Sequence, residues 1–494
     1  MKRQKLICSL LPLLLFVLFS LHLLLGLRGE YLEEVGGMTP FYLNTTFTTH
    51  LLGRGPEGWL AWCSSALGAC MTVPILGASL FTALLCLLAL LLKQGLRIGW
   101  PWTALCYLPS LWLLADFCSG GYELYTSKQT DSTFSLLFAL LFAALLWVIV
   151  GRWVWNKGNK KSVIKHPMGW FALCMTVMVV AGGYAYNHTF KDYNYRSILR
   201  MKQSVEHNDW QSVLDIARQQ KPDVPPTRIQ VCYTRLALYK LGLSGNNLFY
   251  YPDGDSNYAT DIPNQYLRLI AGPQLYYHLG KSNYAYRWCM EDLVEYGLRP
   301  QYLSYMLRAA LINDEQALAD KYARQLNAHP FYHVDTAHAF EAERKEIEPL
   351  RQYNNILDGD GGHVEAYLLQ SYATMQGGTR QMVTLSLDCT LILKDIADFW
   401  PLFVKMLPVW KYENADRIPR HYQEAALLFA YLQGNIDLSG VAIDSDVQKG
   451  FEALIAEATA NSQYGDDFNA RRLRPAYGHT YWYYYFFVNN LKTN

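Results

Sequence analysis

Four acidic residues in the first part of the chain are the side chains best placed, by type and spacing, to do chemistry. Glu30, Glu33 and Glu34 directly follow one long apolar run, and Asp116 stands at the end of another. Carboxylates at such positions could bind a metal ion or act as a general base on a substrate held at a membrane surface. The simpler interpretation, which we favour, is a solvated acidic cluster and a terminal acid that meets water.

Two weaker patterns concern metals. His329 and His333 have the i,i+4 spacing of a zinc site on one helix face, and His338 follows, but Pro330 interrupts the pair and no His-Glu-x-x-His motif is present. The stretch at 358–362 (Asp-Gly-Asp-Gly-Gly) lacks the further ligands of a calcium loop. None of the ten cysteines forms a CxxC pair, so we expect small buried hydrophobes. The sequence predicts no metal site and no cofactor.

The charge is distributed unevenly over the 494 residues. The part before residue 188 has 13 Lys/Arg and 7 Asp/Glu, and the remainder has 30 Lys/Arg and 35 Asp/Glu. The first part combines few charges with long apolar runs, whereas the second has the composition of a water-soluble domain. A net charge near zero without a basic face argues against a nucleic-acid partner. We therefore predict a transmembrane domain over 1–187 and a water-soluble domain over 188–494.

The apolar runs predict about five membrane-spanning helices, since a span needs about 20 mostly apolar residues. The predicted spans are 6–27, 71–92, 98–116, 133–150 and 167–186. The third is short and contains two prolines. Residues 59–69, with two tryptophans, are expected to lie along the membrane surface. The first run is longer than the apolar core of a signal peptide and lacks a small-residue cleavage site, which predicts an uncleaved anchor.

The lysines and arginines of the short loops predict the orientation, because such residues concentrate on the cytoplasmic side. They occur at 2–5, at 93–97 and throughout 152–165, whereas the intervening loops have few. The N-terminus is then cytoplasmic, and the water-soluble domain is extracytoplasmic, on the outer or periplasmic side of the cell (inner) membrane.

The water-soluble part has a helical and segmented pattern. Apolar residues recur at helical spacing from Trp210 to Ala217, and a helix is predicted over 229–241. Tight turns are predicted at 240–242, 278–280, 312–314 and 432–434, with intervals of 38 and 33 residues between the first three. A period near 34 with paired helices is typical of tetratricopeptide repeats. The predicted fold is all-α: about five transmembrane helices, then a tetratricopeptide-like α-solenoid.

The whole chain resembles a family of uncharacterised bacterial multi-span membrane proteins with a degenerate tetratricopeptide-like extracytoplasmic domain. The resemblance rests on the Glu-rich first loop with Pro-Phe-Tyr (40–42) and Gly-Pro-Glu-Gly (55–58), on the helix 236–242 (Leu-Ala-Leu-Tyr-Lys-Leu-Gly) followed by Leu-Phe, and on the terminal 480–485 (Thr-Tyr-Trp-Tyr-Tyr-Tyr). It implies a layout and no catalytic residues.

Seven consecutive aromatic residues, Tyr481–Phe487, allow three interpretations: a closing helix packed on the core, a segment docked on the membrane, or a peptide or glycan platform. We expect a scaffold that binds an envelope protein or peptide, with the lipid bilayer as the other partner. The alternative is an enzyme, since an acidic first outer loop resembles that of lipid-dependent multi-span glycosyltransferases. A transporter subunit is a third, weaker hypothesis. The scaffold requires an exposed groove lined by Tyr and Asn; the enzyme requires a cavity that joins Glu30, Glu33 or Glu34 to Asp116.

Overall fold

The computed structural model describes residues 2–127, 132–154, 166–254, 264–336, 338–351, 356–375, 377–412, 418–434 and 436–488. All regular secondary structure in these ranges is helical, which confirms the predicted all-α class. The chain forms two compact units, described separately below. The first unit comprises residues 1–199, 290–307 and 316–339, and the second comprises 200–289, 308–315 and 340–494.

The first unit contains the apolar helices. Its elements are α1 (Lys2–Leu21), η1 (His22–Leu27), α2 (Gly29–Met38), α3 (Thr45–Leu52), α4 (Pro56–Cys70), α5 (Pro74–Gly95), η2 (Trp100–Tyr107), α6 (Leu108–Ser119), α7 (Glu123–Thr126), α8 (Ser132–Val154), α9 (Pro167–His188), α17 (Gln316–Asn327), and parts of α10 (Tyr193–Glu206), α15 (Ser282–Tyr296) and α16 (Pro300–Ile312).

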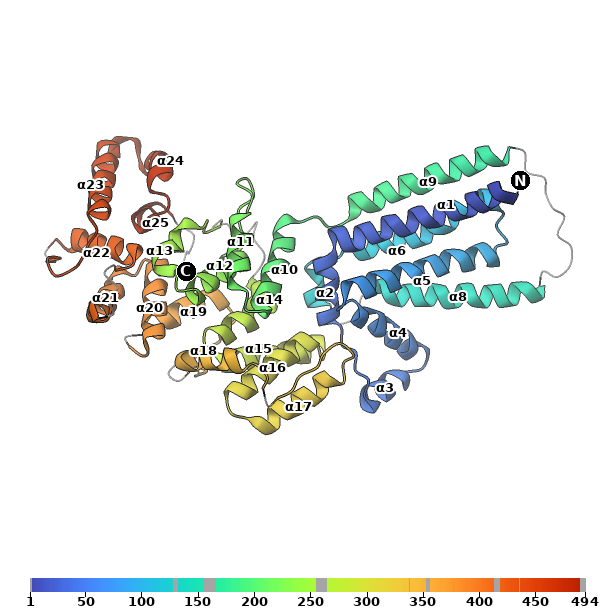
Figure 1. The fold of residues 1–494 in the computed structure, drawn as a ribbon, viewed down its shortest axis with the longest axis horizontal. Coiled ribbons are helices and arrows are strands. Elements are labelled where there is room, and N and C mark those ends of the chain that lie inside the picture. Colours follow the sequence, from blue (N-terminus) through green and yellow to red (C-terminus); the bar gives the residue numbers. More distant parts are fainter. Residues whose placement is uncertain are drawn as a thin grey trace. The chain divides into compact units, whose positions relative to one another are not determined.

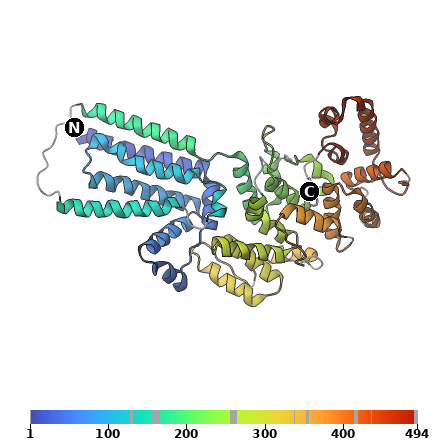
Figure 2. The same cartoon turned by 180° about the vertical axis from the view of Figure 1, so that it is seen from behind.

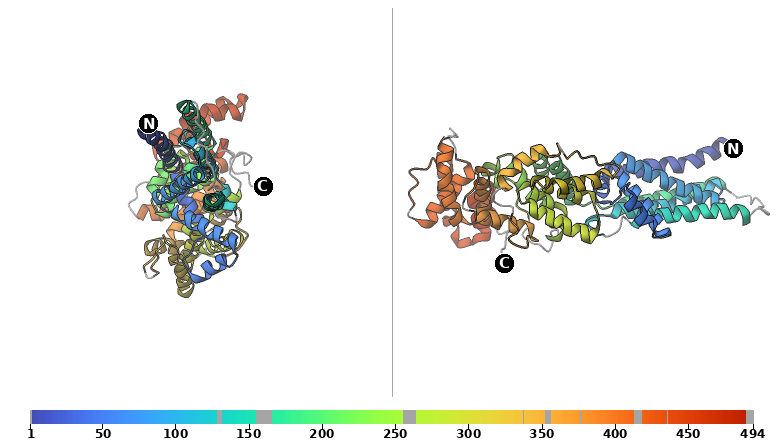
Figure 3. Two further views of the ribbon diagram at one scale, coloured as in Figure 1. Left: turned by 90° about the vertical axis from the view of Figure 1, so that its right-hand side faces the viewer. Right: turned by 90° about the horizontal axis from the view of Figure 1, so that it is seen from below.

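Four helical stretches are long and apolar enough to cross a membrane: 6–27, 74–95, 132–151 and 167–188. Each matches a predicted span to within three residues at either end. The helices α1, α5, α8 and α9 run side by side, and α1 and α9 start at the end of the bundle where α5 and α8 finish (Figures 1 and 2). The view from below shows their axes nearly parallel (Figure 3). Such a bundle is what a multi-span membrane protein requires.

The third predicted span is not one continuous helix. Its residues form the 3-10 helix η2 followed by the 12-residue α6. Pro101 and Pro109 each occupy the first turn of these elements, because proline lacks the N–H that a continuous helix needs and clashes with the preceding turn. At 2.0 Å and 1.5 Å per residue the two elements together extend about 34 Å, enough to cross a hydrocarbon core of about 30 Å. They pack against α5 and α9. Whether the pair crosses the membrane as a fifth span stays a prediction.

The second unit is built from helices that follow one another and pack in sequence. Its elements are the rest of α10, α15 and α16, then α11 (Trp210–Arg218), α12 (Arg228–Lys240), α13 (Ser244–Asn247), η3 (Leu248–Tyr250), α14 (Asn264–His278), α18 (Glu341–Arg351), α19 (Val364–Ala373), α20 (Arg380–Leu393), α21 (Ile396–Tyr412), α22 (Arg420–Gln433), α23 (Ser445–Ala460), η4 (Ser462–Tyr464), α24 (Asp466–Tyr477) and α25 (Tyr481–Phe487).

The second unit contains the four tight turns that the sequence predicts, and each has a residue in the left-handed conformation. Gly242, Gly280 and Gly434 have φ of 67°, 81° and 73°, and Asp314 has φ of 61°. A left-handed residue after the last helical turn stops the helix and redirects the chain, and glycine does this at the lowest steric cost. The helix pairs α11/α12, α19/α20, α20/α21 and α22/α23 pack against each other. Sequential helix pairs are therefore present in this unit.

The core of the second unit follows the predicted periodicity. Along α11 the apolar face is buried, with Val213 and Leu214 wholly inaccessible. Asp209 caps this helix by accepting a hydrogen bond from the backbone N–H of Ser212 at 3.1 Å. The C-terminal helices α21 to α25 gather at one end of the unit (Figures 1 and 2). They provide one wall of the groove described next.

Candidate functional site

A groove of about 730 Å³ opens on the second unit. Its walls come from the segment 220–226 before α12, from the turn 248–254, and from the chain between the end of α24 and Val488. Such a volume lies within the usual range for ligand sites. Its prolines and aromatic residues are Pro222, Pro225, Pro226, Pro252, Phe249, Tyr250, Tyr251, Tyr483, Tyr484 and Phe487.

The start of α12 is fixed by the residues that border the groove. Thr227 accepts a hydrogen bond from the backbone N–H of Gln230, and the Gln230 side chain accepts one from the backbone N–H of Thr227 at 2.8 Å. This reciprocal capping box satisfies two backbone donors that the helix cannot satisfy itself. Pro225 and Pro226 keep the preceding chain extended. Arg228 and Arg235, seven residues apart, consequently lie on one face of α12.

Those two arginines join two acids in a buried ionic cluster at the base of the groove. The Arg228 Nε donates to Glu365 Oε2 at 2.9 Å, and Arg235 Nη1 donates to Glu365 Oε1 at 2.8 Å. Asp253, from the turn 248–254, contacts Arg235 directly and lies 3.7 Å from Arg228 Nη1. The side chains of all four residues are at least 85% buried. Two cations thus face two anions in a space largely shielded from water.

The electrostatics of the cluster keep its carboxylate ionised. Burial alone would raise the pKa of Glu365, but the charges and hydrogen bonds of Arg228 and Arg235 outweigh burial and hold that pKa below its ordinary value. Burial would lower the pKa of Arg228, and Glu365 reverses this, so the pKa of that guanidinium is raised. General acid or base work needs a pKa near the working pH. The cluster therefore fixes the geometry of the groove rather than exchanging protons.

The opposite wall is α25, the helix of consecutive aromatics. Tyr481, Trp482, Tyr483 and Tyr484 are buried, which agrees with the first of the three interpretations of this run, a closing helix packed on the core. Tyr484 donates its hydroxyl to the carbonyl of Ile392 at 2.7 Å. Tyr483, Tyr484 and the following Phe487 also line the groove. One side of α25 therefore packs on the core, and another side lines the groove.

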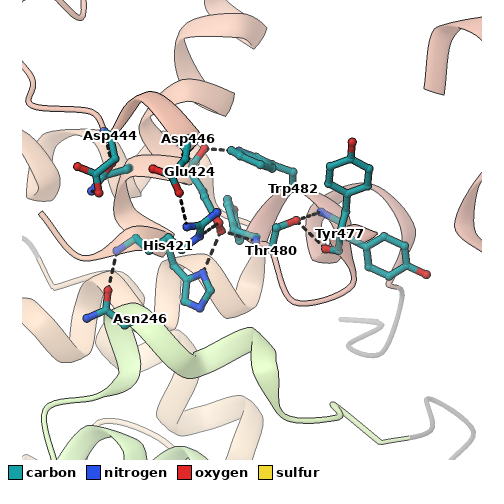
Figure 4. A network of polar contacts seen from close by, with 12 residues as sticks. Asn246, His421, Glu424, Asp444, Asp446, Tyr477, Thr480 and Trp482 are labelled. Carbon is teal, nitrogen blue, oxygen red and sulfur yellow. Dashed lines mark hydrogen bonds and ion pairs between the residues drawn. The ribbon is translucent and has the colours of Figure 1, made fainter. Parts of the chain in front are cut away.

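A polar network centred on Glu424 holds α25 against α22 (Figure 4). Glu424 is wholly buried and accepts hydrogen bonds from Arg420 Nε at 3.1 Å, from His421 Nδ1 at 2.9 Å and from the backbone N–H of Tyr481 at 2.8 Å. Its backbone carbonyl accepts from Trp482 Nε1 at 2.7 Å. A buried carboxylate with three donors is a strong anchor. The network sets the first turn of α25 and hence the aromatic wall.

The rim of the groove carries side chains that remain accessible. Tyr250 is 55% exposed, and its ring centroid lies 4.8 Å from that of His479. Burial lowers the pKa of His479 and so disfavours the protonated ring. Arg474 is exposed on the same rim. An accessible aromatic pair beside a cation suits a ligand with both apolar and polar groups.

The four predicted carboxylates lie in the first unit, each in different surroundings. Glu30 pairs with Arg196 at 3.1 Å. Glu34 is buried and accepts the Tyr125 hydroxyl at 2.8 Å and the Gln301 amide at 3.2 Å.

The remaining two sit nearer the surface. Glu33, which lies between Glu30 and Glu34 in α2, is half-buried. Asp116 is exposed and accepts a hydrogen bond from the Thr133 hydroxyl at 2.6 Å. None of the four lines the cavity of about 570 Å³ beside α2. A catalytic role for them stays a prediction.

The residues of the metal-like motifs have local structural partners. His329 is buried against the rings of Tyr42 and Tyr332, and burial lowers its pKa to about 4. Asp358 accepts a hydrogen bond from Tyr367, which lowers the pKa of that carboxyl. Within the described residues no group of three or more His, Cys, Asp or Glu could hold a metal ion.

Sequence reasoning found one wall of the groove and missed the rest. The aromatic run pointed to α25, but Arg228, Arg235 and Glu365 carried no signal because Glu365 is 137 residues from Arg228. The stretch 249–262 is rich in turn-forming residues, and its first six residues line the groove. Its remainder, like part of the stretch 354–362, lies outside the described residues.

Comparison with known proteins gives one result that bears on the site. Neither the curated proteins nor the solved structures provide a match. A family model, described as a family of unknown function (DUF6057), matches residues 159–488. That range contains every residue that lines the groove and none of the four predicted carboxylates. Because the match spans more than half of the chain, this protein belongs to the DUF6057 family of unknown function.

Proposed function

We propose that this protein is a membrane-anchored binding protein of the cell envelope, and that the groove of the second unit holds an extended segment of a partner polypeptide. The observation that carries the proposal is the composition of the groove, with four prolines and six aromatic residues above a charge-balanced base. Aromatic-lined grooves bind extended peptides by apolar contact and leave the peptide ends free. The partner is then a chain, not a small metabolite enclosed on all sides.

The rigidity of the groove supports binding. Its base is held by the ionic cluster of Arg228, Arg235, Asp253 and Glu365, and its far wall by the Glu424 network. A preformed surface binds with less loss of conformational freedom than one that must be ordered by its ligand. Accessible tyrosine and arginine side chains, such as Tyr250 and Arg474, are the types that contribute most at protein interfaces.

The placement follows from the charge of the loops. Lysines and arginines flank the ends of the apolar helices at 2–5, 93–97 and 152–165, which favours a cytoplasmic N-terminus. With η2 and α6 counted as the third of five crossings, this orientation supports an extracytoplasmic second unit. The alternative, a glycosyltransferase at the outer membrane face, requires its carboxylates to share a cavity. Glu30, Glu34 and Asp116 instead engage separate neighbours, which favours the binding function.

The test is a peptide selection on the full chain reconstituted in nanodiscs. A random peptide library is selected against the wild-type protein, with empty nanodiscs removed first. We expect the enriched peptides to bind the Tyr431→Ala variant as tightly as wild type and the Tyr250→Ala variant about tenfold more weakly, since hot-spot tyrosines contribute at least 1–2 kcal/mol.

The two tyrosines are a matched pair. Tyr250 is 55% exposed in the groove, and Tyr431 is 54% exposed on α22 outside it. If no peptide is enriched over empty nanodiscs, or if both variants bind the selected peptides equally well, the groove is not a peptide site and the proposal is wrong.

A further inference from the structure

A second cavity, of about 570 Å³, lies in the first unit at the end of the apolar helices away from the N-terminus. It is lined by residues of α2, α3, α4 and α7, by the start of α8, and by Tyr296 and Arg299. Figure 1 shows α2, α3 and α4 gathered at that end of the bundle. A cavity at the end of membrane-spanning helices lies at the level of the lipid headgroups.

One residue that lines this cavity is a buried arginine, Arg299. Arg299 is only 3% exposed, and its guanidinium donates to the backbone carbonyls of Tyr125 (3.0 Å) and Ser127, with the sulfur of Met38 at 3.6 Å. No described carboxylate forms an ion pair with it. Backbone carbonyls orient the guanidinium but leave its unit charge uncompensated. A buried charge without a counter-charge is costly and creates a strong preference for an anion.

A second cation reinforces that preference. Arg54, in the turn between α3 and α4, is exposed at the cavity and forms no ion pair with a described residue. Glu57 is the one carboxylate among the lining residues, so the lining carries two positive charges and one negative charge. The lining also includes three serines and Thr39, whose hydroxyl donates to the carbonyl of Val35 at 2.7 Å.

The rest of the lining is apolar. The apolar lining includes Phe47 and Leu51 of α3 and Leu60 and Ala61 of α4. On α4, Trp59 is 57% exposed, as expected for a helix that lies at a membrane surface. A site with cations at one side and aliphatic walls at the other matches a molecule with an anionic head and a hydrocarbon chain, and neither a free ion nor an uncharged lipid would satisfy both parts.

We infer that this cavity binds an anionic phospholipid, with the headgroup phosphate at Arg54 and Arg299 and the upper acyl chain along α3 and α4. The lipid belongs to the leaflet at the end of the bundle opposite the N-terminus. This inference is independent of the groove in the second unit. Its failure would leave the proposed peptide binding untouched, because the two sites share no residue.

The test is native mass spectrometry of the full chain, purified in neutral detergent and supplied with equal amounts of phosphatidylglycerol and phosphatidylcholine. We expect one phosphatidylglycerol per chain in the wild-type protein. Arg54→Gln should reduce that occupancy about tenfold, since it removes a charge-assisted contact to phosphate. Arg97→Gln is the matched control, because Arg97 is an exposed arginine at the opposite end of the bundle, after α5.

Arg299 is tested by a thermal shift, which does not require equal yields of the variants. Phosphatidylglycerol should raise the unfolding temperature of the wild type and of Arg299→Lys, which keeps the charge, and should not raise that of Arg299→Gln. Equal binding of the two lipids, equal occupancy in the Arg54→Gln and Arg97→Gln variants, or displacement of the lipid by millimolar inorganic phosphate would each overturn the inference. The last result would identify a simple anion site.

Discussion

Replacing Glu365 by glutamine should destabilise the second unit strongly, because this carboxylate compensates two buried arginines. Its oxygens accept from both Arg228 and Arg235, and its side chain is 8% exposed. Glutamine keeps the shape but leaves two guanidiniums facing Asp253 alone. Removing one partner of a buried ion pair costs about 3–5 kcal/mol. For a unit of this size, each kcal/mol lowers Tm by about 2–4 °C, so we expect a decrease of about 6–20 °C.

The assay is thermal unfolding of the full chain in detergent, followed by intrinsic fluorescence, with Glu348→Gln as the matched control. Glu348 pairs with Arg351 at 2.7 Å, but its side chain is 49% exposed, so its loss should cost at most about 1 kcal/mol.

Adding Arg235→Met to Glu365→Gln restores the balance of one arginine and one acid and should recover part of the stability. Equal Tm values for the Glu365→Gln and Glu348→Gln variants would refute the reasoning that a charge-balanced cluster supports the groove.

Two other predictions concern protonation and topology. Burial raises the pKa of Asp388, which accepts the Tyr422 hydroxyl at 2.7 Å, to about 7 from an ordinary 3.8. Because the folded state holds this proton more tightly, wild-type stability should fall as pH rises from about 4 to 7. The free energy of unfolding of the Asp388→Asn variant, measured by denaturant titration, should then exceed that of wild type by up to about 4 kcal/mol at pH 8. This difference should shrink toward pH 4. A pH-independent difference would contradict this. For the topology, a membrane-impermeant thiol reagent applied to intact cells should label Tyr464→Cys, at a side chain that is 60% exposed, and not Lys2→Cys; the reverse pattern would invert the proposed orientation.

The sequence was informative wherever the structure depends on neighbours along the chain. Uncharged runs of about 20 residues predicted four spans, since hydropathy depends on composition alone. Glycine after a helical pattern predicted tight turns at Gly242, Gly280 and Gly434, and all three residues are left-handed in the structure. The third predicted span is not one continuous helix, and the reason was visible in the sequence, since Pro109 lies where a continuous helix would need its N–H.

The groove could not be predicted because distant segments assemble it. Phe249 packs against the ring of Tyr484 at 4.8 Å across more than 200 residues of sequence, and Arg228 meets Glu365 from another helix. No sequence period or motif marks either pairing. Each of these residues is of a type that is ordinary in a helix or a turn. The aromatic run 481–487 was the local signal, and it could not distinguish a core helix from a binding wall because α25 is both.

The most direct test of the central claim, that the groove binds a polypeptide, is site-specific photo-crosslinking in living cells. A photoreactive amino acid replaces Tyr250 in the full chain, or Tyr431 in the control, and the adducts are analysed by mass spectrometry. The account predicts a discrete adduct with peptides of a second protein at Tyr250, which is lost when Arg474→Ala and His479→Ala are added, and no such adduct at Tyr431. Adducts of equal yield at both positions, or lipid adducts alone at Tyr250, would contradict it.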